Sequence, residues 1–94
     1  MKNSKSDFQN IPGVGPNMEE HLLLLGYKSI SDLKGENPEQ MYEKDKLIHG
    51  ENLDRCVLYV YRLAVYYANN QEHEIEKLKW WNWKDWKDWY KWKL

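Results

Sequence analysis

The sequence is poor in cysteine. Cys56 is the single cysteine among 94 residues, so the chain cannot form an internal disulfide. The chain also does not open with a charged segment followed by an apolar one, as a secretory leader would. Both absences are typical of a protein from a reducing compartment, and we expect a cytoplasmic location. Because Cys56 lies in an apolar stretch, we expect it to be an inert core thiol and not a nucleophile.

The sequence lacks a long apolar run and an excess of positive charge. The longest apolar stretch, residues 56–68, is interrupted by Arg62 and is too short to span a bilayer, so no membrane partner is expected. The net charge is −1, whereas proteins that bind nucleic acid usually carry a basic surface. Five lysines and two aspartates give residues 79–94 a charge of +3, which leaves −4 for residues 1–78. Attraction to phosphate must therefore come from local geometry or from the C-terminal segment.

A convergent catalytic set is also missing. His21, His49 and His73 fall on separate predicted elements, and the chain has no His-x-x-x-His or Cys-x-x-Cys spacing. We therefore expect three surface histidines and no metal site. Since no nucleophile stands with a base and no phosphate loop or cofactor motif occurs, we expect neither an enzyme nor a resident cofactor.

Helix signals, in contrast, are frequent. With 41% hydrophobic and 31% charged residues the chain has the composition of one globular domain, and its patterning predicts an all-α, compact bundle of about five short helices. The helices should cover residues 6–10, 16–25, 38–48, 53–68 and 72–79. The fourth is apolar on nearly every side, so we expect it to be the buried centre of the fold.

The run Ile11-Pro12-Gly13-Val14-Gly15-Pro16 carries the densest set of conformational signals. Glycines allow positive φ values and close approach to the backbone, and proline suits the first position of a helix. A tight turn leading into a helix leaves N–H groups without partners, which favours an anion such as a phosphate oxygen. The N–H groups concerned are those of Gly13, Gly15, Asn17 and Met18, with Val14 as the side chain that plugs inwards.

These residues resemble the hairpin of the helix-hairpin-helix (SAM-like) family. The likeness extends from Phe8 through the leucines at 22–25 to residues 29–33. Residues 54–68 and 79–85 further resemble the small bacterial pathogenicity-locus family of such proteins, so that the likeness covers about residues 7–85. The resemblance implies DNA binding that does not read sequence, through Gly13, Val14, Gly15, Asn17 and Met18. A monovalent cation on the hairpin carbonyls is also implied. The turn at residues 49–52 lacks a Gly-apolar-Gly pattern, so we expect a degenerate second unit that binds no phosphate.

Tryptophan recurs every three residues near the C-terminus. The series is Trp80, Trp83, Trp86, Trp89 and Trp92, with Trp81 beside it. A three-residue step drifts around an α-helix, so only the first two or three rings, Trp80, Trp81 and Trp83, can share the core face. We therefore expect a helix-hairpin-helix domain over residues 1–85 and a Trp/Lys-rich extension, helix or tail, over residues 86–94.

The extension supports a second function. Exposed aromatic rings favour self-association, a protein partner or stacking on bases, so the chain is alternatively an adaptor or homo-oligomer that uses this aromatic tail. The negative charge of residues 1–78 and the acids Glu19 and Glu20 at a helix start favour this alternative, whereas the hairpin favours DNA.

Overall fold

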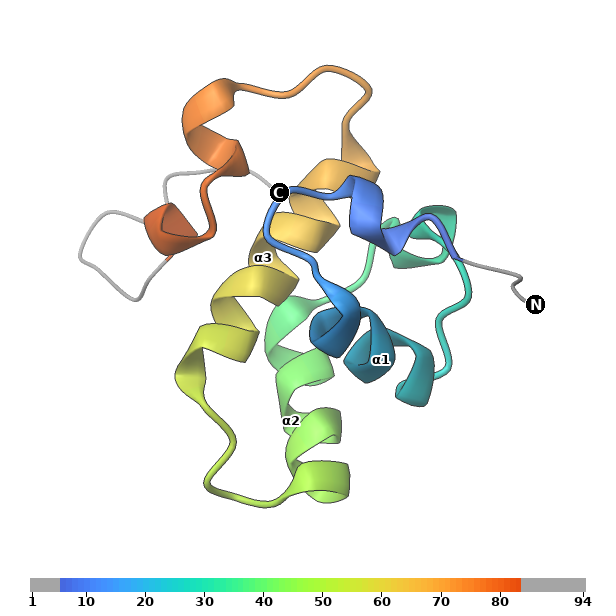
Figure 1. The fold of residues 1–94 in the computed structure, drawn as a ribbon, viewed down its shortest axis with the longest axis vertical. Helices are drawn as coiled ribbons and strands as arrows, with labels where there is room; N and C mark the ends of the chain where they lie inside the picture. The colour runs from blue at the N-terminus through green and yellow to red at the C-terminus, as the bar shows by residue number, and fades with distance from the viewer. Residues whose placement is uncertain (1–5, 84–94) are drawn as a thin grey trace.

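The computed structural model describes residues 6–83, and every regular element among them is helical. There are three α-helices, α1 (Pro16–Leu24), α2 (Pro38–His49) and α3 (Arg55–Asn69), and four 3-10 turns (Figure 1). The turn η1 (Phe8–Asn10) precedes α1, η2 (Ile30–Leu33) lies between α1 and α2, and η3 (Ile75–Leu78) and η4 (Trp80–Trp83) follow α3. The all-α prediction is confirmed for the described part. The predicted number of five helices is wrong, because the first and last form only single 3-10 turns.

The helix ends follow from local sequence signals. Asn37 precedes α2, and its side-chain oxygen accepts a hydrogen bond from the backbone N–H of Gln40 at 3.1 Å. Asp54 caps α3 in the same way by accepting from the N–H of Cys56 at 2.9 Å. Helices α1 and α2 both begin at a proline, where the missing N–H would have had no partner. Short polar side chains and prolines therefore place these helix starts within two residues of where the sequence predicts them.

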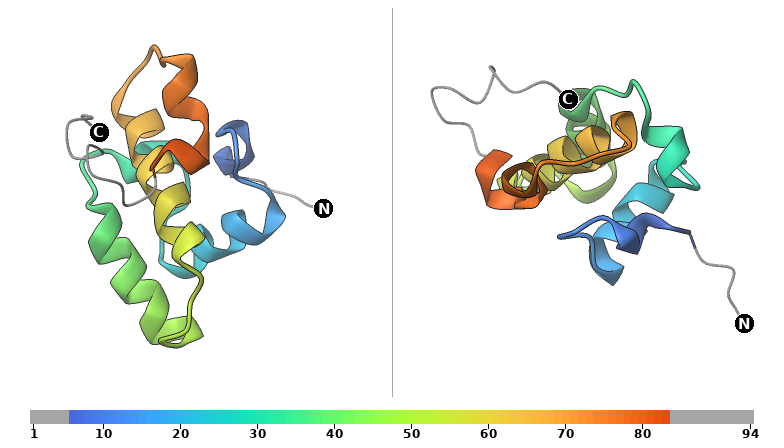
Figure 2. Two further views of the ribbon diagram at one scale, coloured as in Figure 1. Left: turned by 90° about the vertical axis from the view of Figure 1, so that its left-hand side faces the viewer. Right: turned by 90° about the horizontal axis from the view of Figure 1, so that it is seen from above.

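Helix α3 is the centre of the fold. In the left-hand view of Figure 2, α2 lies on one side of α3, and α1 with the N-terminal segment lies on the other. From Val57 to Ala68 every side chain of α3 except Tyr59 and Tyr67 is buried. A helix surrounded in this way must be apolar on all sides, as the sequence predicts.

Arg62 is the buried charge of α3, with 2% of its surface exposed. Its Nη2 and Nε donate to the carboxylate of Glu39 on α2 at 2.7 and 3.2 Å, and its Nη1 donates to the backbone oxygen of Trp83 at 2.6 Å. A buried guanidinium is tolerated only when its donors are satisfied, as they are here. Arg62 thus fastens both α2 and η4 to α3.

The tryptophans divide between core and surface within η4. Trp83 is fully buried and its Nε1 donates to the backbone oxygen of Lys77 at 2.8 Å. Trp80 is partly buried against the core, whereas Trp81 is 48% exposed. The expectation that the first tryptophans cover the core therefore holds for Trp80 and Trp83 but is wrong for Trp81. The predicted extension with Trp86, Trp89 and Trp92 lies outside the described residues.

Candidate functional site

The hairpin (residues 11–15) is a tight turn anchored in the core. The N–H of Val14 donates to the backbone oxygen of Ile11 at 3.0 Å, and the side chains of both residues are buried. Between them Gly13 has a φ of +88°, and a Cβ atom there would lie 3.3 Å from Cδ1 of Trp80. The turn requires glycine at position 13, because L-residues rarely adopt this conformation.

The hairpin leads into the start of α1, where several backbone N–H groups make no hydrogen bond within the described part of the chain. Helix α1 closes its first backbone hydrogen bond from Glu19 to the oxygen of Gly15, at 2.9 Å. Among the described residues, no hydrogen bond is formed by the N–H groups of Gly13, Gly15, Asn17 and Met18. The sequence-predicted binding residues, with Val14 as the buried anchor, therefore lie together in one turn and the first turn of α1. Such a helix start favours an anion.

Gly15 differs from Gly13 in its conformation and surroundings. Its φ is −100° and its ψ is −168°, which is ordinary extended backbone. A Cβ atom added to Gly15 would meet nothing within 4 Å. The fold therefore does not require glycine at this position. Because Gly15 has no side chain, the space next to its backbone is open.

Glu19, the acid nearest this helix start, is held by the N-terminal segment. Its carboxylate accepts hydrogen bonds from the hydroxyl of Ser6 and, at 2.8 Å, from Nε2 of Gln9. These neutral donors spread part of its negative charge, and they fix the side chain against η1.

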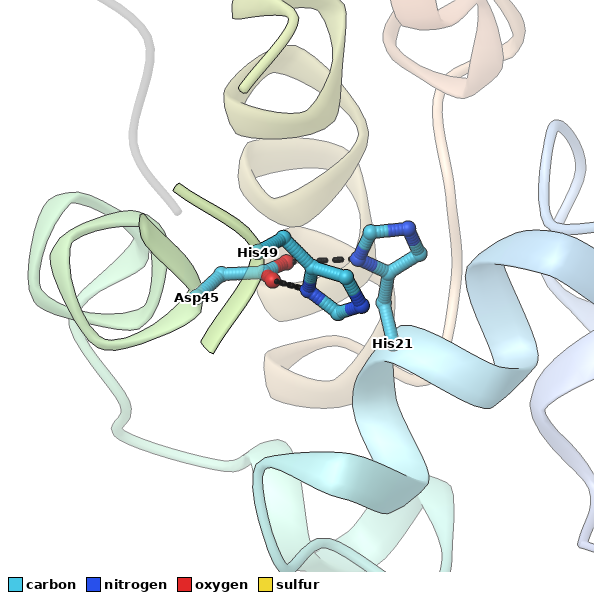
Figure 3. A group of neighbouring side chains, drawn as sticks. All are labelled: His21, Asp45 and His49. Atoms are coloured by element: carbon cyan, nitrogen blue, oxygen red, sulfur yellow. Dashed lines mark hydrogen bonds and ion pairs between the residues drawn. The ribbon is translucent and has the colours of Figure 1, made fainter. Parts of the chain in front are cut away.

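A second group of polar side chains lies where α1 meets α2. Figure 3 shows His21 of α1 and His49 of α2 converging on the carboxylate of Asp45, one helical turn before His49. Nδ1 of His21 lies 2.7 Å from Oδ2 of Asp45, and Nδ1 of His49 lies 2.5 Å from Oδ1. The two imidazole rings approach to 4.4 Å between centroids. We call these three residues the His–Asp–His cluster.

The carboxylate of Asp45 has no exposed surface and a third donor, the hydroxyl of Tyr61 on α3. Burial raises the pKa of Asp45, but the hydrogen bonds from Tyr61, His21 and His49 outweigh it, so the pKa lies below its usual value. The pKa of Tyr61 is raised, mainly by burial and to a smaller extent by its hydrogen bond to Asp45. An ionised carboxylate only accepts hydrogen bonds, so the proton of each imidazole must be on Nδ1 and Nε2 is left for other contacts.

The cluster corrects the sequence-based view of the histidines. His49 lies at the surface, as predicted, with 34% of its side chain exposed, whereas His21 is partly buried, with 19% of its side chain exposed. The two histidines lie on separate helices, as predicted, but their side chains meet at Asp45. The Asp45-x-x-x-His49 spacing puts both side chains on one helix face, and it was the available signal. Nothing in the sequence indicates that His21, 24 residues earlier, would join them, since tertiary packing alone brings α1 to α2.

None of the described helices is long and apolar enough to cross a membrane. Comparison with curated proteins gives no match, and comparison with solved structures gives none either. A family model with the description "Pathogenicity locus" (Cdd1) matches residues 1–88, which is nearly the whole chain. The chain therefore belongs to the Cdd1 pathogenicity-locus family.

Proposed function

We propose that the chain binds the phosphate backbone of DNA through its hairpin, without reading the base sequence. In this proposal η1, the hairpin and α1 form a helix-hairpin-helix unit, and the α2–α3 pair is the degenerate second unit. The observation that carries the proposal is the group of four N–H donors, of Gly13, Gly15, Asn17 and Met18, that make no hydrogen bond to residues 6–83 and lie on a turn anchored by buried Ile11 and Val14. Preorganised backbone donors at a helix start suit a phosphate oxygen and carry no base specificity.

The surroundings of Gly15 support close approach of a backbone. Open space around its Cα would let a phosphate oxygen reach the N–H groups of Gly15 and Asn17. Asn17 is exposed, and the carboxylate of Glu19 is engaged by Ser6 and Gln9. Carbonyl oxygens of the same turn are the place for the monovalent cation that we expect to accompany the phosphate.

The test is a titration of labelled duplex and single-stranded DNA, followed by fluorescence anisotropy at low and high salt. We expect binding that weakens as salt rises. Gly15→Val should weaken binding about tenfold or more, because the new side chain blocks hydrogen bonds to a charged phosphate. Gly15 already has an extended φ of −100°, so valine should fit without unfolding the chain.

Charge variants provide the matched control. Asn17→Lys should strengthen binding by adding a cation at the helix start, whereas Leu47→Lys adds the same charge at an 84% exposed position near the end of α2 and should change affinity less. Circular dichroism would check folding of each variant. Equal affinity of wild type, Gly15→Val and Asn17→Lys, all folded, would remove the hairpin as the binding site.

A second candidate function is that of a protein adaptor or homo-oligomer. It is favoured by Ile75 and Trp81, which are 74% and 48% exposed and precede the Trp/Lys-rich extension in the sequence. Sedimentation of the full chain and of a chain truncated after Asp85 would separate the two functions. Association that disappears on truncation, without DNA binding by either form, supports the adaptor.

A further inference from the structure

We propose that the His–Asp–His cluster is a binding site for one divalent transition-metal ion of the zinc type. The ligands would be Nδ1 of His21, Nδ1 of His49 and Oδ1 of Asp45. This site is separate from the hairpin and does not depend on DNA binding.

The donor atoms of the three side chains converge. One ligand atom from each of the three side chains lies within 4.8 Å of the other two. In a tetrahedral zinc site with bonds of about 2.0–2.1 Å, neighbouring ligand atoms are about 3.3 Å apart. Nδ1 of His49 lies 2.5 Å from Oδ1 of Asp45, so this pair needs to separate by less than about 1 Å to admit an ion, and Nδ1 of His21 lies 2.7 Å from Oδ2 of the same carboxylate.

Asp45 is held in position by a neighbouring side chain. Metal-bound carboxylates are usually oriented by a further hydrogen bond from a neighbouring residue. Here the hydroxyl of Tyr61 donates to Oδ2, which leaves Oδ1 as the oxygen that faces His49. Asp45 itself has no exposed surface, so its charge is held in place and strongly favours a cation nearby.

The cluster is open to solvent, and its ligand atoms favour some metal ions over others. His49 keeps 34% of its side-chain surface exposed, so an ion can enter from solvent and a water molecule can occupy a fourth position. Two imidazole nitrogens and one carboxylate oxygen suit zinc and the neighbouring late first-row metals, whereas magnesium and calcium prefer sites made of oxygen alone.

Proton balance is straightforward. Each Nδ1 gives up its hydrogen when the ion binds. From a neutral ring the proton reappears on Nε2, and from an imidazolium ring it is released to solvent. Since His21 lies on α1 and the other ligands on α2, the bound ion would cross-link the helix that follows the hairpin to α2.

The test uses the intact chain, treated with a chelator and then freed of it. Zinc chloride would be titrated by calorimetry, and cobalt(II) by its visible absorption. We expect one ion per chain, and a melting temperature higher by about 10 °C when zinc is present at a hundredfold excess over Kd. Absence of saturable binding would overturn the proposal.

Asparagine variants distinguish loss of a metal ligand from loss of a hydrogen bond to Asp45. His21→Asn and His49→Asn each keep an N–H donor near the position of Nδ1 but lose the imidazole ligand, so we expect zinc affinity to fall tenfold or more. His73→Asn, outside the cluster, is the matched control and should bind as wild type does. Unchanged affinity in both cluster variants would contradict the assignment.

A measurement on the wild-type chain covers the case in which a variant fails to fold. Long-range proton–nitrogen NMR spectra resolve Nδ1 and Nε2 of each histidine. Zinc should shift the Nδ1 signals of His21 and His49 and leave those of His73 in place. Zinc-induced shifts at His73 alone, or none at all, would overturn the proposal.

Discussion

Gly13 and Gly15 lie two residues apart in the hairpin, but only one of these positions requires glycine for its backbone conformation. Gly13 has a φ of +88° and lies against Trp80, so it maintains the turn. Gly15 has an extended backbone and open space, so it is the position at which a ligand could approach. In the sequence the two glycines look equivalent on either side of Val14, and only their φ values distinguish their roles.

This difference predicts opposite results for one substitution. Gly13→Ala should destabilise the fold by about 1–2 kcal/mol, because the alanine would be strained at positive φ and its Cβ would press on Trp80. Gly15→Ala should change stability by less than about 0.5 kcal/mol. Urea denaturation of both variants measures the pair. Equal losses of stability would mean that the turn is not built as described.

Tyr61 and Tyr42 allow a similar comparison of hydrogen bonds. Tyr61 donates to the buried carboxylate of Asp45, whereas Tyr42 donates to the neutral backbone oxygen of Leu53 at 2.7 Å. Removal of a bond to a charged group costs about 1.5–3 kcal/mol and removal of a neutral one about 0.5–1.5 kcal/mol. We therefore expect Tyr61→Phe to be the more destabilising change in urea denaturation, and the reverse order would contradict the role given to Asp45.

At the scale of elements, α3 packs against α2, η2, η3 and η4. Leu63 on α3 is fully buried, and its Cδ2 atom lies 3.6 Å from the position of a Cβ on Gly13, so the core helix directly supports the hairpin. Arg62, next to it in sequence, joins α3 to Glu39 of α2 and to η4. Damage to α3 should therefore reach the candidate DNA site through packing.

Leu63→Ala should lower the free energy of unfolding by about 2–5 kcal/mol, since it leaves a cavity in the core of a small domain. Leu47→Ala is the matched control, because Leu47 is 84% exposed and its loss should cost less than about 0.5 kcal/mol. Chemical denaturation decides between them. A small effect at Leu63 would show that α3 is not the centre of the fold.

At the scale of the whole molecule, the sequence predicts well what local chemistry decides. The starts of α2 and α3 follow from Asn37 and Asp54, whose side chains accept hydrogen bonds from N–H groups in the first turn of each helix. The burial of α3 follows from its apolar circumference. The sequence predicts less well whether helices form near the two ends of the described chain. Residues 72–79 carry helical patterning but form only the 3-10 turn η3, and no side chain caps it.

Features that depend on packing between distant segments escape the sequence. Trp81 and Trp83 carry the same side chain, yet only Trp83 meets Arg62 and the core. His21 joins Asp45 across 24 residues because α1 packs near α2, and no spacing rule anticipates this. Gly13, Val14, Gly15, Asn17 and Met18 could be predicted to lie together because they fall within six consecutive residues.

The most direct test of hairpin binding is an NMR titration of the nitrogen-labelled chain with a short DNA duplex. We expect the amide signals of Gly13, Gly15, Asn17 and Met18 to shift most, because their N–H groups would donate to phosphate. Random and defined duplex sequences should give the same pattern, since backbone contacts carry no base information. Shifts confined to other elements, or no shifts at low salt, would contradict it.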